Sequence, residues 1–186
     1  YRRLCEVIEE VRPDILHAHS PVLNGLAALR AARKFSIPVV YEIRAFWEDA
    51  AVDHGTSSEG GFRYKGTRAL ETYVAKRVDW VTTICDGLQM DLCNRGLPSE
   101  RITVVPNAVN LESFPFRQPR DSELDAKYDL EGKIVLGFVG SFYHYEGIGT
   151  LVEAMPEVTK ALPEARLLLV GGGPCYEDVQ QSIQRL

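Results

Sequence analysis

Short apolar runs alternate with longer helical segments along the first part of the chain. Residues 23–35, about 63–77 and 86–95 have helical patterns. The runs between them are rich in Val, Ile and Thr and bounded by Pro, Asp or Gly, as buried strands are: DILHAHS, PVVYEIRA, DWVTTI and RITVVPNA. This alternation predicts an α/β fold, with a parallel sheet flanked by helices on both faces.

The alternation stops near the middle of the chain and then begins again. Residues 111–132 are mostly polar. After them come the strand-like runs KIVLGFVG and ARLLLVGGG, each followed by a helical segment. We therefore expect part of one Rossmann-like domain at 1–110, a linker at 111–132 and the beginning of a second such domain at 133–186. Because helical patterns are cut off at both ends, we expect the chain to be a truncated piece of a longer protein.

Composition and charge argue against some classes of function. The 186 residues include 21 basic and 26 acidic side chains, a formal net charge of −5. A general nucleic-acid binder would show a basic stripe, so we expect no nucleic-acid partner. No apolar run approaches the roughly 18 residues of a membrane-spanning helix. The four cysteines form no CxxC pair, which favours reduced thiols in an intracellular protein.

The residues that follow the predicted strands are polar and rich in glycine. In an open parallel sheet, ligands bind beyond the carboxyl ends of the strands. Here those ends carry HAHS, EIRAFWED, TTICDG, VPNAVN, GSFYHYEG and GGGP. The sequence therefore predicts a site at this edge.

Two histidines stand two residues apart on the first predicted strand, so His17 and His19 face the same side. A metal site would need a third ligand. Asp49, Asp53 and His54 are near in sequence, but nothing fixes their geometry. We favour a histidine that lines a substrate cleft over a metal site; a purely structural role is the other alternative.

The segment after PVVYE, residues 43–66, shows no clear periodicity until Arg63. Loops of this length in compact domains are usually functional or mobile. Its aromatic, carboxylate and hydroxyl side chains suit the binding of sugars, whereas a disordered surface loop is the alternative.

Glycine segments follow both strand-like runs of the second half. GSFYHYEG and GGGP each lie between a strand and a helix, where backbone can approach a phosphate closely. Neither segment contains lysine or arginine. The phosphate interpretation is therefore weakened.

The motifs VVPNAVNLESF, IVLGFVGSFYHYEGIGTLVEAMPEV and ARLLLVGGGP resemble the retaining glycosyltransferases of family 4, which have the GT-B fold. The resemblance covers essentially the whole chain. The stretch from YEIRAFWED to VTTIC is similar to a bacterial subgroup found with exopolysaccharide and exosortase gene sets.

The resemblance implies two Rossmann-like domains that face each other across a cleft. The first binds a glycan or lipid-linked acceptor and the second a nucleotide-diphosphate sugar, which is a substrate; no cofactor and no essential metal are expected. It implies a cytoplasmic protein, either free or in peripheral contact with the inner face of the membrane.

The resemblance also assigns residues. Arg44 stands where the family often has a histidine near the reacting sugar, so it is the catalytic candidate. Ser141 and Glu146 stand where the family usually has arginine and lysine, which indicates altered donor recognition. The donor-binding candidates are Gly140, Ser141, Glu146, Gly171, Gly172 and Gly173. The acceptor-side candidates are His17, His19, Glu42, Trp47 and Asn107.

Two other functions fit the same pattern: a nucleotide-sugar 2-epimerase and a non-catalytic sugar- or nucleotide-binding module. The acidic E-x7-E motif of the family would lie beyond Leu186, and the glycine-rich first loop before Tyr1. We therefore expect the chain alone to be inactive and, through exposed sheet edges, to self-associate.

Overall fold

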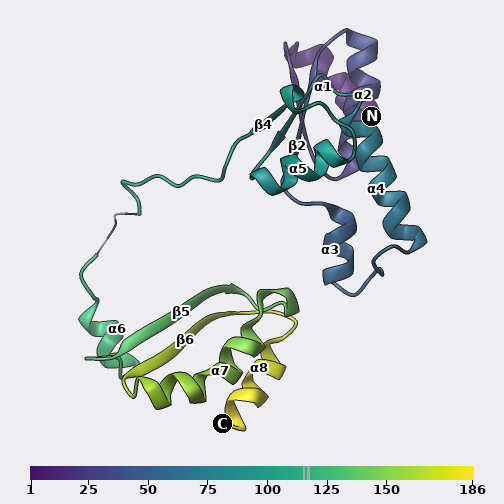
Figure 1. The fold of residues 1–186 in the computed structure, drawn as a ribbon. Helices are drawn as coiled ribbons and strands as arrows, with labels where there is room; N and C mark the ends of the chain where they lie inside the picture. Colours follow the sequence, from purple (N-terminus) through teal and green to yellow (C-terminus); the bar gives the residue numbers. More distant parts are fainter. Residues whose placement is uncertain (115, 117) are drawn as a thin grey trace. The chain divides into compact units, whose positions relative to one another are not determined.

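The computed structural model describes residues 1–114, 116 and 118–186. The chain divides into two compact units, Tyr1–Val109 and Asn110–Leu186 (Figure 1). Each unit is an α/β arrangement around a parallel sheet, as the alternating pattern predicts.

The sheet of the first unit has, within the described residues, the strand order β1-β2-β3-β4. These strands are β1 (Leu16–His19), β2 (Val39–Ile43), β3 (Trp80–Thr83) and β4 (Ile102–Val104). All neighbours are parallel, so their carboxyl ends meet at one edge. The pattern places every one of these strands correctly.

Helices pack their apolar residues against this sheet. They are α1 (Arg2–Val11), α2 (Val22–Phe35), α4 (Phe62–Ala75) and α5 (Asp86–Asn94). Val39, Tyr41 and Ile43 alternate along β2 and so lie on one face of the strand, where they are fully buried in the core.

A buried carboxylate joins α2, α4 and β2. Glu71 of α4 is only 1% exposed. It accepts hydrogen bonds of 2.7 Å from the Val22 backbone N–H and 2.7 Å from the Tyr41 hydroxyl. Helix α2 has no side-chain cap of its own at Pro21, so Glu71 caps its N-terminus from another helix. Burial raises the pKa of Glu71, because desolvation penalises the ionised carboxylate.

The segment that the sequence predicts as an aperiodic loop contains a helix, α3 (Trp47–Asp53). A buried ion pair fixes its first turn: Arg95 Nη1 lies 2.6 Å from Glu48 Oε1, and the guanidinium stacks 3.7 Å above the Phe46 ring. Helix α3 contacts α4, to which a loop joins it (Figure 1). The missed helix is short, and its anchor is a contact across 47 residues that no local pattern reveals.

The second unit pairs β5 (Ile134–Ser141) with β6 (Ala165–Gly172) in parallel. Helices α7 (Ile148–Ala161) and α8 (Tyr176–Gln184) pack together around a core that Phe142, Ile148, Val152, Cys175 and Val179 form.

The segment predicted as a linker also contains a helix, α6 (Ser122–Lys127). The Asp121 side chain caps it by accepting from the N–H groups of Glu123 and Leu124. Residues 115 and 117 of that segment lie outside the described residues.

The glycine run at the end of β6 is required by close backbone packing. A Cβ on Gly171 would lie 1.8 Å from the Gly140 carbonyl oxygen, and one on Gly173 would lie 2.9 Å from the Phe142 nitrogen. Both residues have positive φ, 152° and 148°, which disfavours other residues. This packing accounts for Gly171 and Gly173 without any ligand.

Across the residues described, the structure has no helix with the length and apolar character needed to cross a membrane.

Replacement of Glu71 tests its role in the first unit. Glu71→Ala leaves the Val22 N–H and the Tyr41 hydroxyl without their acceptor, and we expect it to lower the free energy of unfolding by about 2–4 kcal/mol. Glu71→Gln keeps an acceptor oxygen and should cost less than about 1.5 kcal/mol. Urea unfolding followed by tryptophan fluorescence measures this, since Trp47 and Trp80 both lie in the first unit.

The same variants carry a pH signature. Because the folded-state pKa of Glu71 is raised, its contribution to stability is complete below the unfolded pKa of about 4.3 and is lost as pH rises through the folded value. The stability of the wild type relative to Glu71→Gln should therefore be greater at about pH 4 than at about pH 7. Equal losses for the Ala and Gln variants would contradict the capping role.

Replacement of the glycines tests the packing constraint in the second unit. Gly171→Ala should destabilise this unit by more than about 3 kcal/mol, because the methyl group meets backbone and φ is positive. Gly172→Ala is the matched control: a Cβ there meets nothing within 4 Å, so we expect less than about 1 kcal/mol. Amide hydrogen exchange of β5 and β6 reports both values; equal protection in the two variants would refute the packing argument.

Candidate functional site

The carboxyl edge of the first sheet brings together polar side chains from three strands and two loops. His17 and His19 project from β1, and Glu42 projects from β2, where it is the direct partner of His19 in the parallel register. Arg44 follows β2, and Asn107 follows β4. The sequence prediction of a polar edge is thus realised as one cluster.

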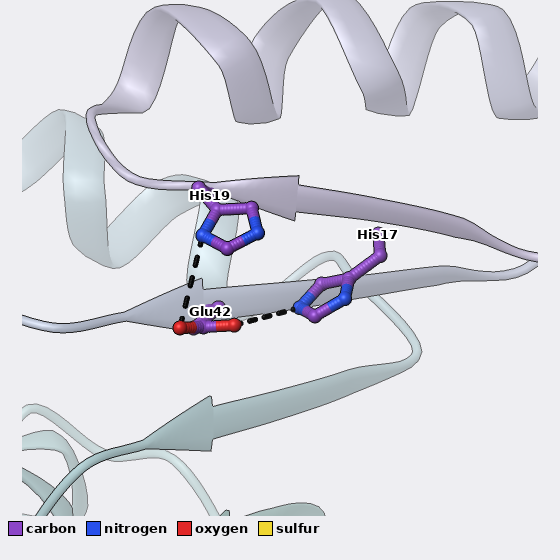
Figure 2. Close-up of side chains that lie close together, drawn as sticks. All are labelled: His17, His19 and Glu42. Atoms are coloured by element: carbon purple, nitrogen blue, oxygen red, sulfur yellow. Dashed lines mark ion pairs between the residues drawn. The ribbon is translucent and has the colours of Figure 1, made fainter. Parts of the chain in front are cut away.

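Glu42 is the centre of this cluster. Its Oε2 lies 3.0 Å from His17 Nε2, and its Oε1 lies 3.7 Å from His19 Nδ1. Figure 2 shows both imidazole rings with a nitrogen directed at the carboxylate. The rings stack on each other, with centroids 4.8 Å apart. One carboxylate therefore contacts two histidines.

Arg44 connects Glu42 to the loop after β4. Its Nε lies 3.9 Å from Glu42 Oε1, and its Nη2 donates a 3.1 Å hydrogen bond to Asn107 Oδ1. The guanidinium is more than half exposed, so it is held by these contacts and remains open to a ligand. This placement joins the catalytic candidate to two of the acceptor-side candidates.

A cavity of about 270 Å³ lies at this edge. Thr82 lines it from β3, and its Oγ1 is buried with no hydrogen-bond partner among the described residues. Sequence reasoning did not select Thr82, although TTICDG ends a predicted strand. His17, Glu42, Arg44 and Asn107 also line the cavity.

The cavity combines side chains with complementary hydrogen-bonding capacity. Glu42 is an acceptor, Arg44 is a donor, and Asn107 and Thr82 can be both. Such a set matches the hydroxyl groups of a sugar, each of which donates and accepts. A few polar groups of this kind fix the orientation of a small ligand in a pocket.

Two acceptor-side candidates lie apart from this cavity lining. Trp47 begins α3 and is about half exposed, and its contribution to a cleft stays a prediction. His19 lines a neighbouring cavity of about 410 Å³ with His17 and Asn24. Asn24, which the sequence did not single out, donates to the His19 carbonyl oxygen at 3.1 Å and so steadies the turn after β1.

The donor-binding candidates of the second unit lie at the ends of β5 and β6. Gly140 pairs with Gly171, and Ser141 pairs with Gly172. Glu146 is exposed in a single 3₁₀ turn, His144–Glu146, that precedes α7.

A cavity of about 290 Å³ lies near the starts of α7 and α8. Its described lining includes none of the six donor-binding candidates and contains the carboxylates of Glu153 and Asp178. Among the described residues, no lysine or arginine lines this cavity, and phosphate binding by the six donor-binding candidates stays a prediction.

Solved structures with the same fold support the two-unit architecture. A crystal structure of Anabaena HepE in complex with UDP-glucose matches with a TM-score of 0.74 at 17% identity, over 100% of this chain and 48% of that one. A UDP-GlcNAc 2-epimerase from Neisseria meningitidis matches with a TM-score of 0.53 at 18% identity, over 100% of this chain and 49% of that one. The fold is the GT-B arrangement of Rossmann-like units.

Curated relatives are glycosyltransferases. A 2-deoxystreptamine glucosyltransferase of Streptomyces kanamyceticus is 27% identical over 91% of this chain and 45% of its own length. An alpha-monoglucosyldiacylglycerol synthase of Acholeplasma laidlawii is 21% identical over 93% of this chain and 45% of its own. The chain thus spans slightly less than half the length of these relatives.

Two family profiles divide the chain close to the boundary between the units. Residues 133–186 match the profile described as Glycosyl transferases group 1. Residues 1–113, more than half of the chain, match the profile described as Glycosyltransferase Family 4. The chain therefore belongs to glycosyltransferase family 4.

Proposed function

We propose that the full-length protein containing this chain is a retaining glycosyltransferase that transfers a sugar from a nucleotide-diphosphate donor to a polysaccharide or lipid-linked acceptor. Family membership supports the reaction class. The observation that carries the proposal is the Glu42–Arg44–Asn107 cluster, which lines a cavity at the carboxyl edge of the first sheet.

In this proposal the first unit binds the acceptor. Glu42 accepts a hydrogen bond from an acceptor hydroxyl, while Arg44 and Asn107 fix its orientation. The acceptor oxygen attacks the anomeric carbon from the face that the diphosphate leaves, the bond from that carbon to the diphosphate breaks, and the hydroxyl proton passes to the departing diphosphate, on which negative charge grows. Arg44 is the cation proposed to stabilise that charge, since its guanidinium is exposed and held by neighbours.

The second unit binds the donor in the same proposal. HepE, which shares the fold, was solved in complex with UDP-glucose, and this supports a nucleotide-sugar donor. Because Ser141 and Glu146 carry no positive charge, we propose that this unit recognises the diphosphate through backbone N–H groups at the ends of β5 and β6. We propose that the transfer needs no cofactor and no essential metal.

A transfer assay tests this function. The full-length protein is incubated with UDP- and GDP-sugars and with a polysaccharide or lipid-linked acceptor, and release of the nucleoside diphosphate is measured. We expect release that depends on the acceptor. Arg44→Ala should lower kcat/KM by about 10²–10³-fold, because it removes a cation from the developing charge. Arg33→Ala, an exposed cation near the end of α2, is the matched control and should leave the rate unchanged.

Two results would contradict the proposal, and a third would contradict the expectation that this chain alone is inactive. Acceptor-independent conversion of the donor sugar to its 2-epimer would identify an epimerase. Donor binding without turnover would identify a binding module. Full turnover by the 186-residue chain alone would show that the missing half of the relatives' length is not required.

A further inference from the structure

Two histidine side chains and one carboxylate lie close together at the carboxyl ends of β1 and β2. His17 and His19 project from the same face of β1, and the parallel register sets Glu42 of β2 directly beside His19. Their nearest ligand atoms all lie within 4.8 Å of one another. The strands themselves therefore fix the separation of the three side chains.

This separation suits a transition metal ion. Imidazole nitrogen and carboxylate oxygen bind Zn²⁺ at about 2.0–2.2 Å, which puts neighbouring tetrahedral ligands about 3.3 Å apart. The two nitrogen-to-oxygen distances, 3.0 Å and 3.7 Å, lie on either side of that value. The two distances end on different oxygens of Glu42, so the side chains have to rotate to surround one ion, and both rings are about half exposed, which leaves them room to do so.

The direction of the rings supports the same conclusion. Figure 2 shows each imidazole with a nitrogen directed at a different oxygen of the Glu42 carboxylate. Two stacked imidazoles that share one carboxylate bring two nitrogen ligands and an oxygen ligand within 4.8 Å of one another. With exposures of 50%, 55% and 21%, the three side chains leave access for the ion and for a water molecule as its fourth ligand.

We propose that His17, His19 and Glu42 form a binding site for Zn²⁺ or a similar imidazole-preferring ion. The donor set excludes hard ions such as Mg²⁺, which prefer oxygen ligands. The site shares His17 and Glu42 with the cavity proposed for sugar transfer, and its role is not that of a reaction cofactor. An ion here would engage Glu42 and compete with Arg44 for that carboxylate.

Replacement of Arg44 tests the proposal, because it should change the affinity for the metal ion in the opposite direction to replacement of a ligand. The guanidinium Nε of Arg44 lies 3.9 Å from Glu42 Oε1, so its charge opposes a cation at the site. Removal of Arg44 should therefore strengthen metal binding, whereas removal of a ligand weakens it. A loss of folding cannot produce this gain.

The experiment is calorimetric titration of the 186-residue chain with ZnCl₂ and, separately, with MgCl₂. We expect one Zn²⁺ site per chain and no heat of binding for Mg²⁺. His17→Ala, His19→Ala and Glu42→Gln should each weaken Zn²⁺ binding by more than about tenfold. Arg44→Ala should strengthen it by about fivefold, through loss of the opposing charge.

Matched controls separate this site from other ligands of the chain. His144→Ala removes a histidine of the second unit, and Cys85→Ser removes an exposed thiol; both should bind Zn²⁺ as the wild type does. Circular dichroism of each variant checks its fold. Absence of Zn²⁺ binding, its persistence in folded Glu42→Gln, its loss in Cys85→Ser, or weaker binding in Arg44→Ala would overturn the proposal.

Discussion

The first unit depends on one buried carboxylate. Glu71 lies in the core, where its carboxylate accepts hydrogen bonds from the first backbone N–H of α2 and from the Tyr41 hydroxyl. Fixed dipoles thus compensate for the lost hydration, although desolvation still raises the pKa of both Glu71 and Tyr41. The interaction orients the turn between β1 and α2 and the strand β2. Strand β1, which leads into that turn, carries His17 and His19, and β2 carries Glu42, so the interaction helps to fix the two strands that hold the cluster.

Glycine has a different role in the second unit from the one that its pattern suggests. A glycine run between a strand and a helix is typical of a phosphate cradle. Here Gly171 and Gly173 allow β6 and the following turn to pass within contact of the backbone of Gly140 and Phe142. Their φ angles and the absence of space for a Cβ explain why no other residue fits. The run can still approach a ligand, but its presence alone is not evidence of one.

The sequence predicts the strands and the polar residues at their ends, but it does not predict which of these residues contact one another. Alternation of apolar runs and helices is a local signal, and so is the polarity of HAHS and EIRAFWED. The pairing of Glu42 with His19 depends on the register between strands that are 23 residues apart along the chain, so the third partner of the histidines could not be read from spacing. Asp49, Asp53 and His54, the residues near in sequence that a metal site would have drawn on, lie beyond β2, on or just after α3. Likewise, the Arg95–Glu48 pair that fixes α3 has no local signature.

The central claim is that Glu42 and Arg44 act together in the cavity of the first unit. The most direct test is a double-mutant cycle on kcat/KM of the full-length protein, with Glu42→Gln, Arg44→Gln and the double variant. If the pair acts as a unit, the double variant loses little more activity than the more damaging single variant. Strictly additive losses would mean that the two residues act separately, and would contradict the account.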